Sequence, residues 1–214
     1  MNEALDHIVW ICDDLERGSR QFEDLTGVAP IFGGVHASGV TENAIIGLGA
    51  RRYLEILAPV PGHGSELDEW ARLASKAKVA RVLTYCLRGP HPLEELARAT
   101  RARGWKNANV EENGRTRPDG VRLQWQWLAP VVEPFGVAFP FFIDWLDSVH
   151  PSESAPASEV NRRVSLQGFS VGHPQAQLLA RTLHNLGFSV DTFEAPKTSF
   201  RVQLDTPRGP VLLA

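Results

Sequence analysis

The 214-residue sequence has only two cysteines, Cys12 and Cys86, which lie far apart with no spacing typical of a metal site. This scarcity argues against a disulfide framework and favours a reducing cytosol. No apolar run approaches the roughly 20 residues needed to span a bilayer, and the N-terminus lacks the basic and apolar regions of a targeting signal. We therefore expect a cytoplasmic protein with no membrane partner.

An excess of charge of one sign is also lacking, because 22 Lys and Arg residues are balanced by 25 Asp and Glu residues. The net charge of −3 gives no electrostatic reason to expect a nucleic-acid partner. The P-loop, GxGxxG and GxSxG patterns are absent, so NTPase, dinucleotide and hydrolase functions have no motif support. With 43% apolar residues, the chain has an ordinary globular composition.

Two short apolar runs each carry one polar side chain that could bind a metal. The run LDHIVWI contains His7, and the run RYLEIL contains Glu55. Both runs are typical of short, largely buried strands. Period-two alternation puts His7 on one face with Leu5 and Val9, and Glu55 likewise shares a face with apolar neighbours. Because a buried carboxylate needs a partner, these two polar groups are candidates for one site.

Strand and helix signals recur three times in the order β-α-β-β-β. A helix begins near Asp14 and ends at Gly27, and helices of similar length end at Gly104 and Gly187. This internal repeat predicts an α+β fold; the alternative is a generic α+β fold whose elements alternate by chance. The expected division is a pair of modules in 1–150 (1–58 and 79–150, with an insertion helix in 59–78) and a third module in 164–214.

Several finer expectations accompany this division. Gly33 and Gly34 are expected to end a short strand over 28–32, and a Pro-, Ser- and Ala-rich stretch at 150–160 is expected to be a linker. Trp125 and Trp127 alternate with glutamines, which predicts a strand whose tryptophans belong to the core. The second module shows three strand-like segments, at 79–87, 121–128 and 139–146.

Four segments carry a resemblance to a known family. LDHIVWICDDLERGSRQFEDLTG and GGVHASGVTENAIIGLGARRYLEILAP resemble the opening module of the glyoxalase/bleomycin-resistance/extradiol-dioxygenase superfamily, which has the vicinal oxygen chelate fold. RTRPDGVRLQWQWLAP and PFFIDW are similar to its glyoxalase-like domain branch, whose members are mostly bacterial. The resemblance implies β-α-β-β-β modules whose mixed sheets curl, barrel-like, around a cleft. It also implies a divalent metal held by the first and fourth strands of each module.

Matching the family pattern assigns a site to this sequence. The metal ligands implied are His7, Glu55 and Asp144, while Tyr85 stands where a fourth ligand is expected. One histidine and two carboxylates would leave open positions on Fe, Mn, Ni or Zn. The implied activity is that of a metal-dependent lyase or dioxygenase acting on a small oxygenated substrate, with Glu55 also moving a proton. The alternative is a metal-free protein that sequesters a small ligand, in which His7 is hydrogen-bonded to Glu55.

Four further residues are candidates for substrate binding: His36, Asn43, Arg115 and Arg117. The first two lie beside a Gly-rich loop, where turn chemistry is the competing explanation, and His36 is also a candidate spare metal ligand. The two arginines precede the Pro118-Asp119-Gly120 turn and could bind a carboxylate or phosphate, unless the loop is merely solvated. The third module must bury its sheet face, which suggests a structural role or a homodimer.

Overall fold

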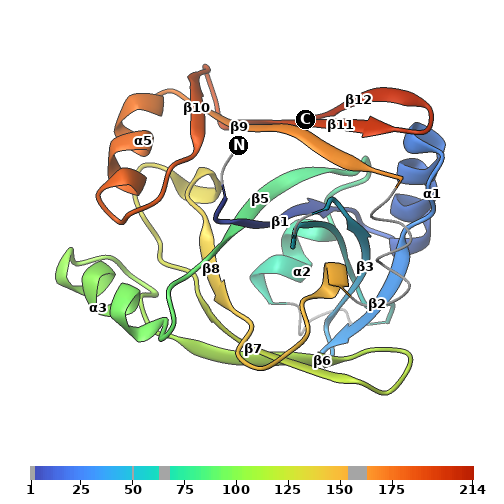
Figure 1. Ribbon diagram of the computed structural model, residues 1–214, viewed down its shortest axis with the longest axis horizontal. Coiled ribbons are helices and arrows are strands. Elements are labelled where there is room, and N and C mark those ends of the chain that lie inside the picture. Colours follow the sequence, from blue (N-terminus) through green and yellow to red (C-terminus); the bar gives the residue numbers. More distant parts are fainter. Residues whose placement is uncertain (1–2, 50, 63–67, 154–162) are drawn as a thin grey trace.

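The computed structural model describes residues 3–49, 51–62, 68–153 and 163–214. Its main feature is a closed barrel with the strand order β1-β4-β3-β2-β6-β7-β8-β5 (Figure 1). The bounds of the barrel strands are β1 (Leu5–Ile11), β2 (Ile31–His36), β3 (Thr41–Gly47), β4 (Tyr53–Pro59), β5 (Arg81–Arg88), β6 (Glu111–Thr116), β7 (Arg122–Leu128) and β8 (Phe141–Asp144).

The barrel consists of two halves with the same wiring. In one half β1 lies beside β4, followed by β3 and β2, and in the other β5 lies beside β8, followed by β7 and β6. The halves join where β1 pairs with β5 and where β2 pairs with β6, both antiparallel, whereas β1–β4 and β5–β8 are parallel. The predicted α+β fold of repeated modules, with a barrel-like mixed sheet, is therefore confirmed.

Strand β2 continues through the two glycines that were expected to end it. Its pairing with β3 shifts register between Phe32 and Gly34, and Gly34 has a φ of 126°, which glycine adopts at low cost. Such a shift marks a β-bulge, which bends a strand without ending it. The strand therefore continues to His36 and places this residue in the barrel wall.

Strand β6 was not predicted, because its sequence EENGRT lacks any apolar alternation. It is nevertheless required for closure of the barrel, since it pairs with β7 along its length and with β2 at its end. Cross-strand pairing positions Arg115 directly opposite His36. The sequence signal is weak because the inward positions of this strand are polar.

The helices are α1 (Leu15–Thr26), α2 (Glu69–Ala74), α3 (Glu94–Ala102) and α5 (Ala176–His184), with short 3-10 turns η1 (Gly136–Ala138) and η2 (Pro151–Glu153). Asp14 caps α1 by accepting a hydrogen bond from the Arg17 backbone N–H at 2.7 Å, and Gly27 ends it with a φ of 75°. Within the described residues, no helix has the length and apolar character needed to cross a membrane. Most of the predicted linker (154–160) lies outside the described residues.

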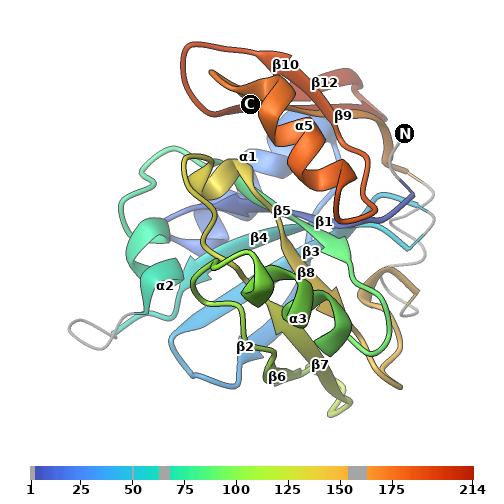
Figure 2. The ribbon, with the colours of Figure 1, turned by 90° about the vertical axis from the view of Figure 1, so that its left-hand side faces the viewer.

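The C-terminal unit contains β9 (Ser165–His173), β10 (Asp191–Glu194), β11 (Ser199–Thr206) and β12 (Gly209–Leu213). Its elements follow the predicted order, but its sheet has the order β10-β9-β11-β12, unlike either barrel half. Figures 1 and 2 show this sheet and α5 lying across one side of the barrel. Phe169 and Phe200 contact Tyr85 of the barrel, and their ring centroids lie 4.9 and 6.3 Å, respectively, from that of Tyr85.

Both cysteines are expected to be unreactive in the folded protein. Cys12 and Cys86 are buried, and burial raises the pKa of the Cys12 thiol to about 11 and that of Cys86 well above its usual range. Because the thiolate is the reactive form, native protein at pH 8 should give almost no colour with Ellman's reagent, and denatured protein should give two thiols per chain. Rapid modification of the native protein would contradict this burial.

Candidate functional site

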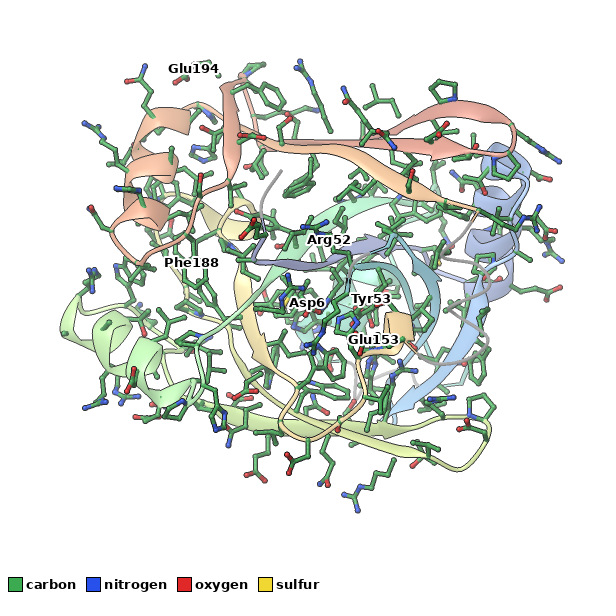
Figure 3. The ribbon with its side chains drawn as sticks, in the orientation of Figure 1. Asp6, Arg52, Tyr53, Glu153, Phe188 and Glu194 are labelled. Carbon is green, nitrogen blue, oxygen red and sulfur yellow. The ribbon has the colours of Figure 1, made fainter. Side chains whose placement is uncertain are left out.

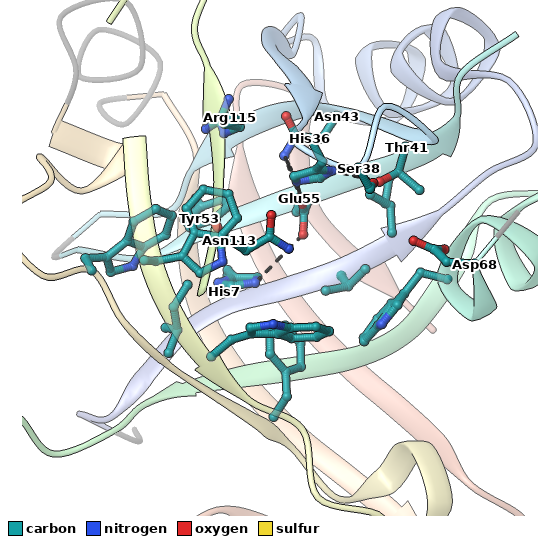
Figure 4. Close-up of a pocket in the computed structure, with 18 residues that line it drawn as sticks. His7, His36, Ser38, Thr41, Asn43, Tyr53, Glu55, Asp68, Asn113 and Arg115 are labelled. Carbon is teal, nitrogen blue, oxygen red and sulfur yellow. Dashed lines mark hydrogen bonds and ion pairs between the residues drawn. The ribbon is translucent and has the colours of Figure 1, made fainter. Parts of the chain in front are cut away.

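A pocket opens inside the barrel and, with its mouth, contains about 750 Å³ not occupied by protein atoms (Figure 4). A concave pocket with apolar and aromatic walls and a few converging polar groups is typical of a small-molecule site. The wall of this pocket contains polar groups on one part and tryptophan and phenylalanine rings on another. The lining residues are His7, Val9, His36, Ser38, Thr41, Asn43, Tyr53, Glu55, Leu57, Asp68, Trp70, Asn113, Arg115, Trp125, Trp127, Phe141, Ile143 and Trp145.

His7 is held in a defined orientation on β1. Its Nδ1 lies 2.8 Å from Asp6 Oδ1, and its ring stacks on Tyr53 with centroids 4.6 Å apart. Since Asp6 is ionised, Nδ1 carries a proton and donates it, and in the neutral form of the imidazole the lone pair of Nε2 is then free. This Nε2 lies 3.8 Å from Glu55 Oε2, so the two predicted residues do converge.

Glu55 lies on β4, has a side chain that is only 10% exposed, and has three polar neighbours. Asn43 Nδ2 donates to its Oε1 at 2.5 Å, and His36 Nε2 lies 3.5 Å from the same oxygen. Burial alone would raise the pKa of Glu55, but hydrogen bonding from His36, the charges of His36 and His7, and the Asn43 amide together lower it to about 2. Glu55 is therefore a carboxylate throughout the physiological pH range.

His36 completes this group from β2. Its Nδ1 is 2.9 Å from Thr41 Oγ1, while Nε2 faces Glu55. The two histidines thus share one arrangement, in which Nδ1 is engaged by a neighbour and Nε2 faces the same carboxylate. The bulge in β2 places His36 here, which explains why spacing alone made it only a spare candidate.

The alternation predicted for the first strand is confirmed in part. Val9 lines the pocket with His7, whereas Leu5 packs in the core outside the barrel. The pairing of β1 with β5 shifts register between Leu5 and His7, and this irregularity moves Leu5 to the other face.

The structure does not bring Asp144 to the other two predicted ligands. Its carboxylate lies 2.6 Å from Nδ1 of the exposed His91 and accepts a hydrogen bond from the Leu146 backbone N–H. On β8 the pocket-lining residues are Phe141 and Ile143, so period two turns Asp144 away from the pocket. The prediction that Asp144 lines the cleft is therefore corrected.

Tyr85, expected opposite His7, also faces away from the pocket. It is fully buried among the phenylalanines of the C-terminal unit, and Cys86 is the residue that pairs with His7 across β1 and β5. A one-residue difference in register reverses the face of every side chain on a strand. The prediction matched the two modules by their helices, and this match does not determine the strand register. The second barrel half thus places Cys86, Phe141 and Ile143 at its inner positions.

The candidate substrate-binding residues divide into two groups. His36, Asn43 and Arg115 all line the pocket, and Arg115 is only 4% exposed. Arg117 instead pairs with Asp119 at 2.5 Å and lines a neighbouring cavity, which Arg115 also lines. The tryptophans expected in the core, Trp125 and Trp127, form part of the pocket wall.

Asp6 was missed as a functional residue. Its side chain is fully buried and lies near the middle of the ring of strands (Figure 3). Besides His7, it accepts a hydrogen bond from Trp145 Nε1 at 3.2 Å, and it lies 3.3 Å from His150 Nε2 and 3.8 Å from Arg88 Nη1. The sequence did contain a signal for Asp6, because it is a second polar residue next to His7 in a strand that is buried on both faces.

Asp6, His7 and Cys86 also bring potential ligand atoms within 4.8 Å of one another. This group is a poor candidate for a metal, because burial, with the charges of Asp6 and Glu55, raises the pKa of Cys86 well above its usual range. Asp6 already has several donors, and neither Asp6 nor Cys86 lines the pocket. The pocket-facing group of His7, His36 and Glu55 is the better candidate.

Comparison with known proteins decides the family. A model described as "Glyoxalase-like domain" matches residues 5–187, which is most of the chain. The chain belongs to this glyoxalase-like family. It is therefore a member of the vicinal oxygen chelate superfamily, as the resemblance implied. No curated protein sequence matches it.

Solved structures are similar to this glyoxalase-like protein at low identity. A hypothetical protein from Staphylococcus aureus is 15% identical with a TM-score of 0.64, covering 91% of this chain and 87% of that one. Methylmalonyl-CoA epimerase from Mycobacterium tuberculosis is 15% identical (TM-score 0.44; 65% and 85% covered). A mutant 4-hydroxymandelate synthase from Streptomyces coelicolor is 10% identical (TM-score 0.46; 99% and 63% covered). The Staphylococcus aureus structure shows similarity of fold alone.

Proposed function

We propose that the protein is a metal-dependent enzyme of the glyoxalase-like class that acts on a small oxygenated substrate in the barrel pocket. The observation that carries this proposal is the convergence of His7 Nε2, His36 Nε2 and the Glu55 carboxylate on one part of the pocket wall. Two imidazoles and one carboxylate form the donor set of the facial triads that bind Fe(II) and related ions.

The residues fit such an ion in orientation and, in part, in spacing. Ligand atoms bound to one transition-metal ion at about 2.1 Å lie about 3 Å apart. The two histidines approach Glu55 to 3.5 and 3.8 Å, but at different oxygens. One ligand atom from each of the three residues is not within 4.8 Å of both others, so an ion would have to draw the side chains together. The orientation fits because a ligating histidine is held in place by the hydrogen bond that its Nδ1–H donates to a group outside the metal sphere. Asp6 and Thr41 supply that contact.

The chain's own groups would then have separate roles. A divalent ion held here would supply Lewis-acid polarisation of a substrate oxygen. Glu55, with a pKa of about 2, is a weak proton acceptor, so its environment favours a role as ligand over the predicted role in proton transfer. The aromatic wall would exclude water from the bound substrate.

Metal titration of the purified protein tests this proposal. Chelator-stripped wild type should bind about one Mn(II), Fe(II), Ni(II) or Zn(II) ion per chain by calorimetry, as expected for a single-site triad. His7→Ala, His36→Ala and Glu55→Gln should each weaken binding by at least about tenfold. The matched controls His91→Ala and Asp144→Ala, which alter a pair turned away from the pocket, should leave the affinity unchanged.

Two results would contradict the proposal in different ways. Loss of binding in Asp144→Ala with retention in His36→Ala would show that the ligand set is wrong. Wild-type protein that binds none of the four ions would favour a metal-free sequestering protein. That second candidate is supported by the absence of a carboxylate or imidazole at the inner positions Cys86, Phe141 and Ile143 of the second barrel half.

A further inference from the structure

Arg115 is a cation inside the barrel whose charge has no close carboxylate partner among the residues that the structure describes. The residue is 4% exposed and lies on the pocket-lining face of β6. Its Nη1 donates a hydrogen bond to the Gly33 backbone carbonyl. Among the described parts of the chain, no carboxylate oxygen comes within 4.0 Å of its guanidinium, whereas Arg117 on the same strand has an aspartate partner.

The charges near Arg115 do not replace such a partner. Glu55 contributes a favourable electrostatic interaction, but its oxygens are already engaged by Asn43, His36 and His7. Burial lowers the pKa of Arg115, which shows that the protein environment disfavours the charged form. Buried charges in proteins are normally paired, and a guanidinium binds a carboxylate through two parallel hydrogen bonds.

Space for this arginine is provided by a glycine. A Cβ atom at Gly33 would overlap both Arg115 Nη1 and Asn43 Oδ1. The same bulge that carries β2 to His36 therefore also admits the guanidinium to the barrel interior. The cation and the proposed metal-binding group are thus positioned by one local feature of β2.

The rest of the pocket wall favours a flat apolar group. Trp70, Trp127 and Phe141 form a cluster with ring centroids 5.4 to 6.4 Å apart and tilted or edge-on planes. Trp125 adds a further ring beside His36, with centroids 6.1 Å apart. Tilted aromatic rings offer faces and edges to another ring, whereas they offer a hydrophilic sugar or phosphate few hydrogen bonds.

We propose that the ligand of this pocket is a small aromatic carboxylate, whose carboxylate pairs with Arg115 and whose ring packs against the tryptophan and phenylalanine wall. The inference deepens the proposed function by naming its substrate class, and the reaction itself rests on that function. Ligand selection by Arg115 and the aromatic wall does not depend on a metal, so the two proposals can fail separately.

The test uses phenylacetate as the probe, with phenylacetamide as its neutral isostere and cyclohexylacetate as its non-aromatic analogue. Binding to chelator-treated full-length protein is followed by quenching of tryptophan fluorescence, because several tryptophans line the pocket. We expect phenylacetate to bind at least about tenfold more tightly than either analogue. Equal binding of the acid and the amide, or no binding of phenylacetate up to about 10 mM, would overturn the proposal.

Variants identify the residue responsible. Arg115→Gln should abolish the preference for the acid over the amide, Arg115→Lys should retain part of it, and Arg117→Gln should leave it unchanged. Circular dichroism checks that each variant is folded, and the wild-type preference remains decisive if Arg115→Gln does not fold. An acid preference that survives in folded Arg115→Gln overturns the assignment. Metal binding without the acid preference would contradict this inference alone, and the acid preference without metal binding would contradict only the proposed function.

Discussion

Replacement of Asp6 by alanine is expected to lower the free energy of unfolding by about 3–5 kcal/mol, the usual effect of removing one partner from a buried charge pair. The fully buried carboxylate accepts hydrogen bonds from His7 and Trp145 and lies within ion-pair distance of His150 and Arg88. Of these donors, only His7 has another carboxylate near it among the described residues, that of Glu55 at 3.8 Å. Urea denaturation followed by circular dichroism measures the change.

The control for Asp6→Ala is Glu16→Ala, which removes an exposed carboxylate paired with Arg20 on α1. This change should cost less than about 1 kcal/mol. Equal effects of the two substitutions would show that the buried network contributes little. A second readout is metal affinity, which should fall about 10- to 100-fold in Asp6→Asn because the residue orients His7.

The lowered pKa of the Asp6 carboxylate leads us to expect a pH dependence of the free energy of unfolding. Burial would raise the pKa of Asp6, but hydrogen bonds and charges from His150 and His7 outweigh burial and hold the pKa well below its usual range. Because the folded-state pKa is below the unfolded-state pKa, the contribution is fully present above about pH 4 and is lost as pH falls further. The stability difference between wild type and Asp6→Asn should therefore narrow below about pH 4.

The sequence predicted the centre of the candidate site because two polar residues interrupt apolar strands. His7 and Glu55 are detectable by period two alone, and β1 and β4 are neighbours in the barrel, so their side chains meet. His36 was only a spare candidate, since its position depends on a bulge at Gly34 that shifts the strand register. Local geometry of this kind leaves little trace in hydrophobic periodicity.

Asp144 and Tyr85 show the opposite failure, in which a correct strand was assigned the wrong face. Both lie on strands whose two faces are buried, one against the pocket and the other against surrounding elements. Apolar neighbours are then found on either face, so alternation cannot distinguish the inside of the barrel from the outside. Asp144 shares its face with Phe142, as predicted, but Phe142 packs outside the barrel against Phe188.

The C-terminal unit illustrates why element order does not determine strand order. Its sequence follows the β-α-β-β-β pattern, yet β9 lies between β10 and β11 and closes no barrel. Its apolar residues instead cover the outer face of β5 and β8, where Tyr85 meets Phe169 at 4.9 Å and Phe142 meets Phe188 at 5.0 Å. The unit therefore supplies a large part of the core that the barrel needs.

Truncation after Glu153 is consequently expected to abolish stable folding of the barrel. The shortened chain would expose fully buried side chains such as Tyr85 and Phe142, and each large apolar group contributes about 1.5–3 kcal/mol when buried. The loss of several such groups is comparable to the roughly 5–15 kcal/mol by which a typical domain is stable. Thermal unfolding followed by circular dichroism should show no cooperative transition, and the fluorescent dye ANS should bind strongly.

A point substitution at the same interface tests the contribution of packing without shortening the chain. Phe169→Ala in the full-length protein should cost about 3–5 kcal/mol, as expected for a buried phenylalanine, whereas Gln167→Ala on the exposed side of β9 should change stability by less than about 0.5 kcal/mol. If the truncated chain unfolds cooperatively at the wild-type temperature, the barrel does not need this cover. The exposed outer face of β5 would then have to be stabilised by another contact, such as a second copy of the chain.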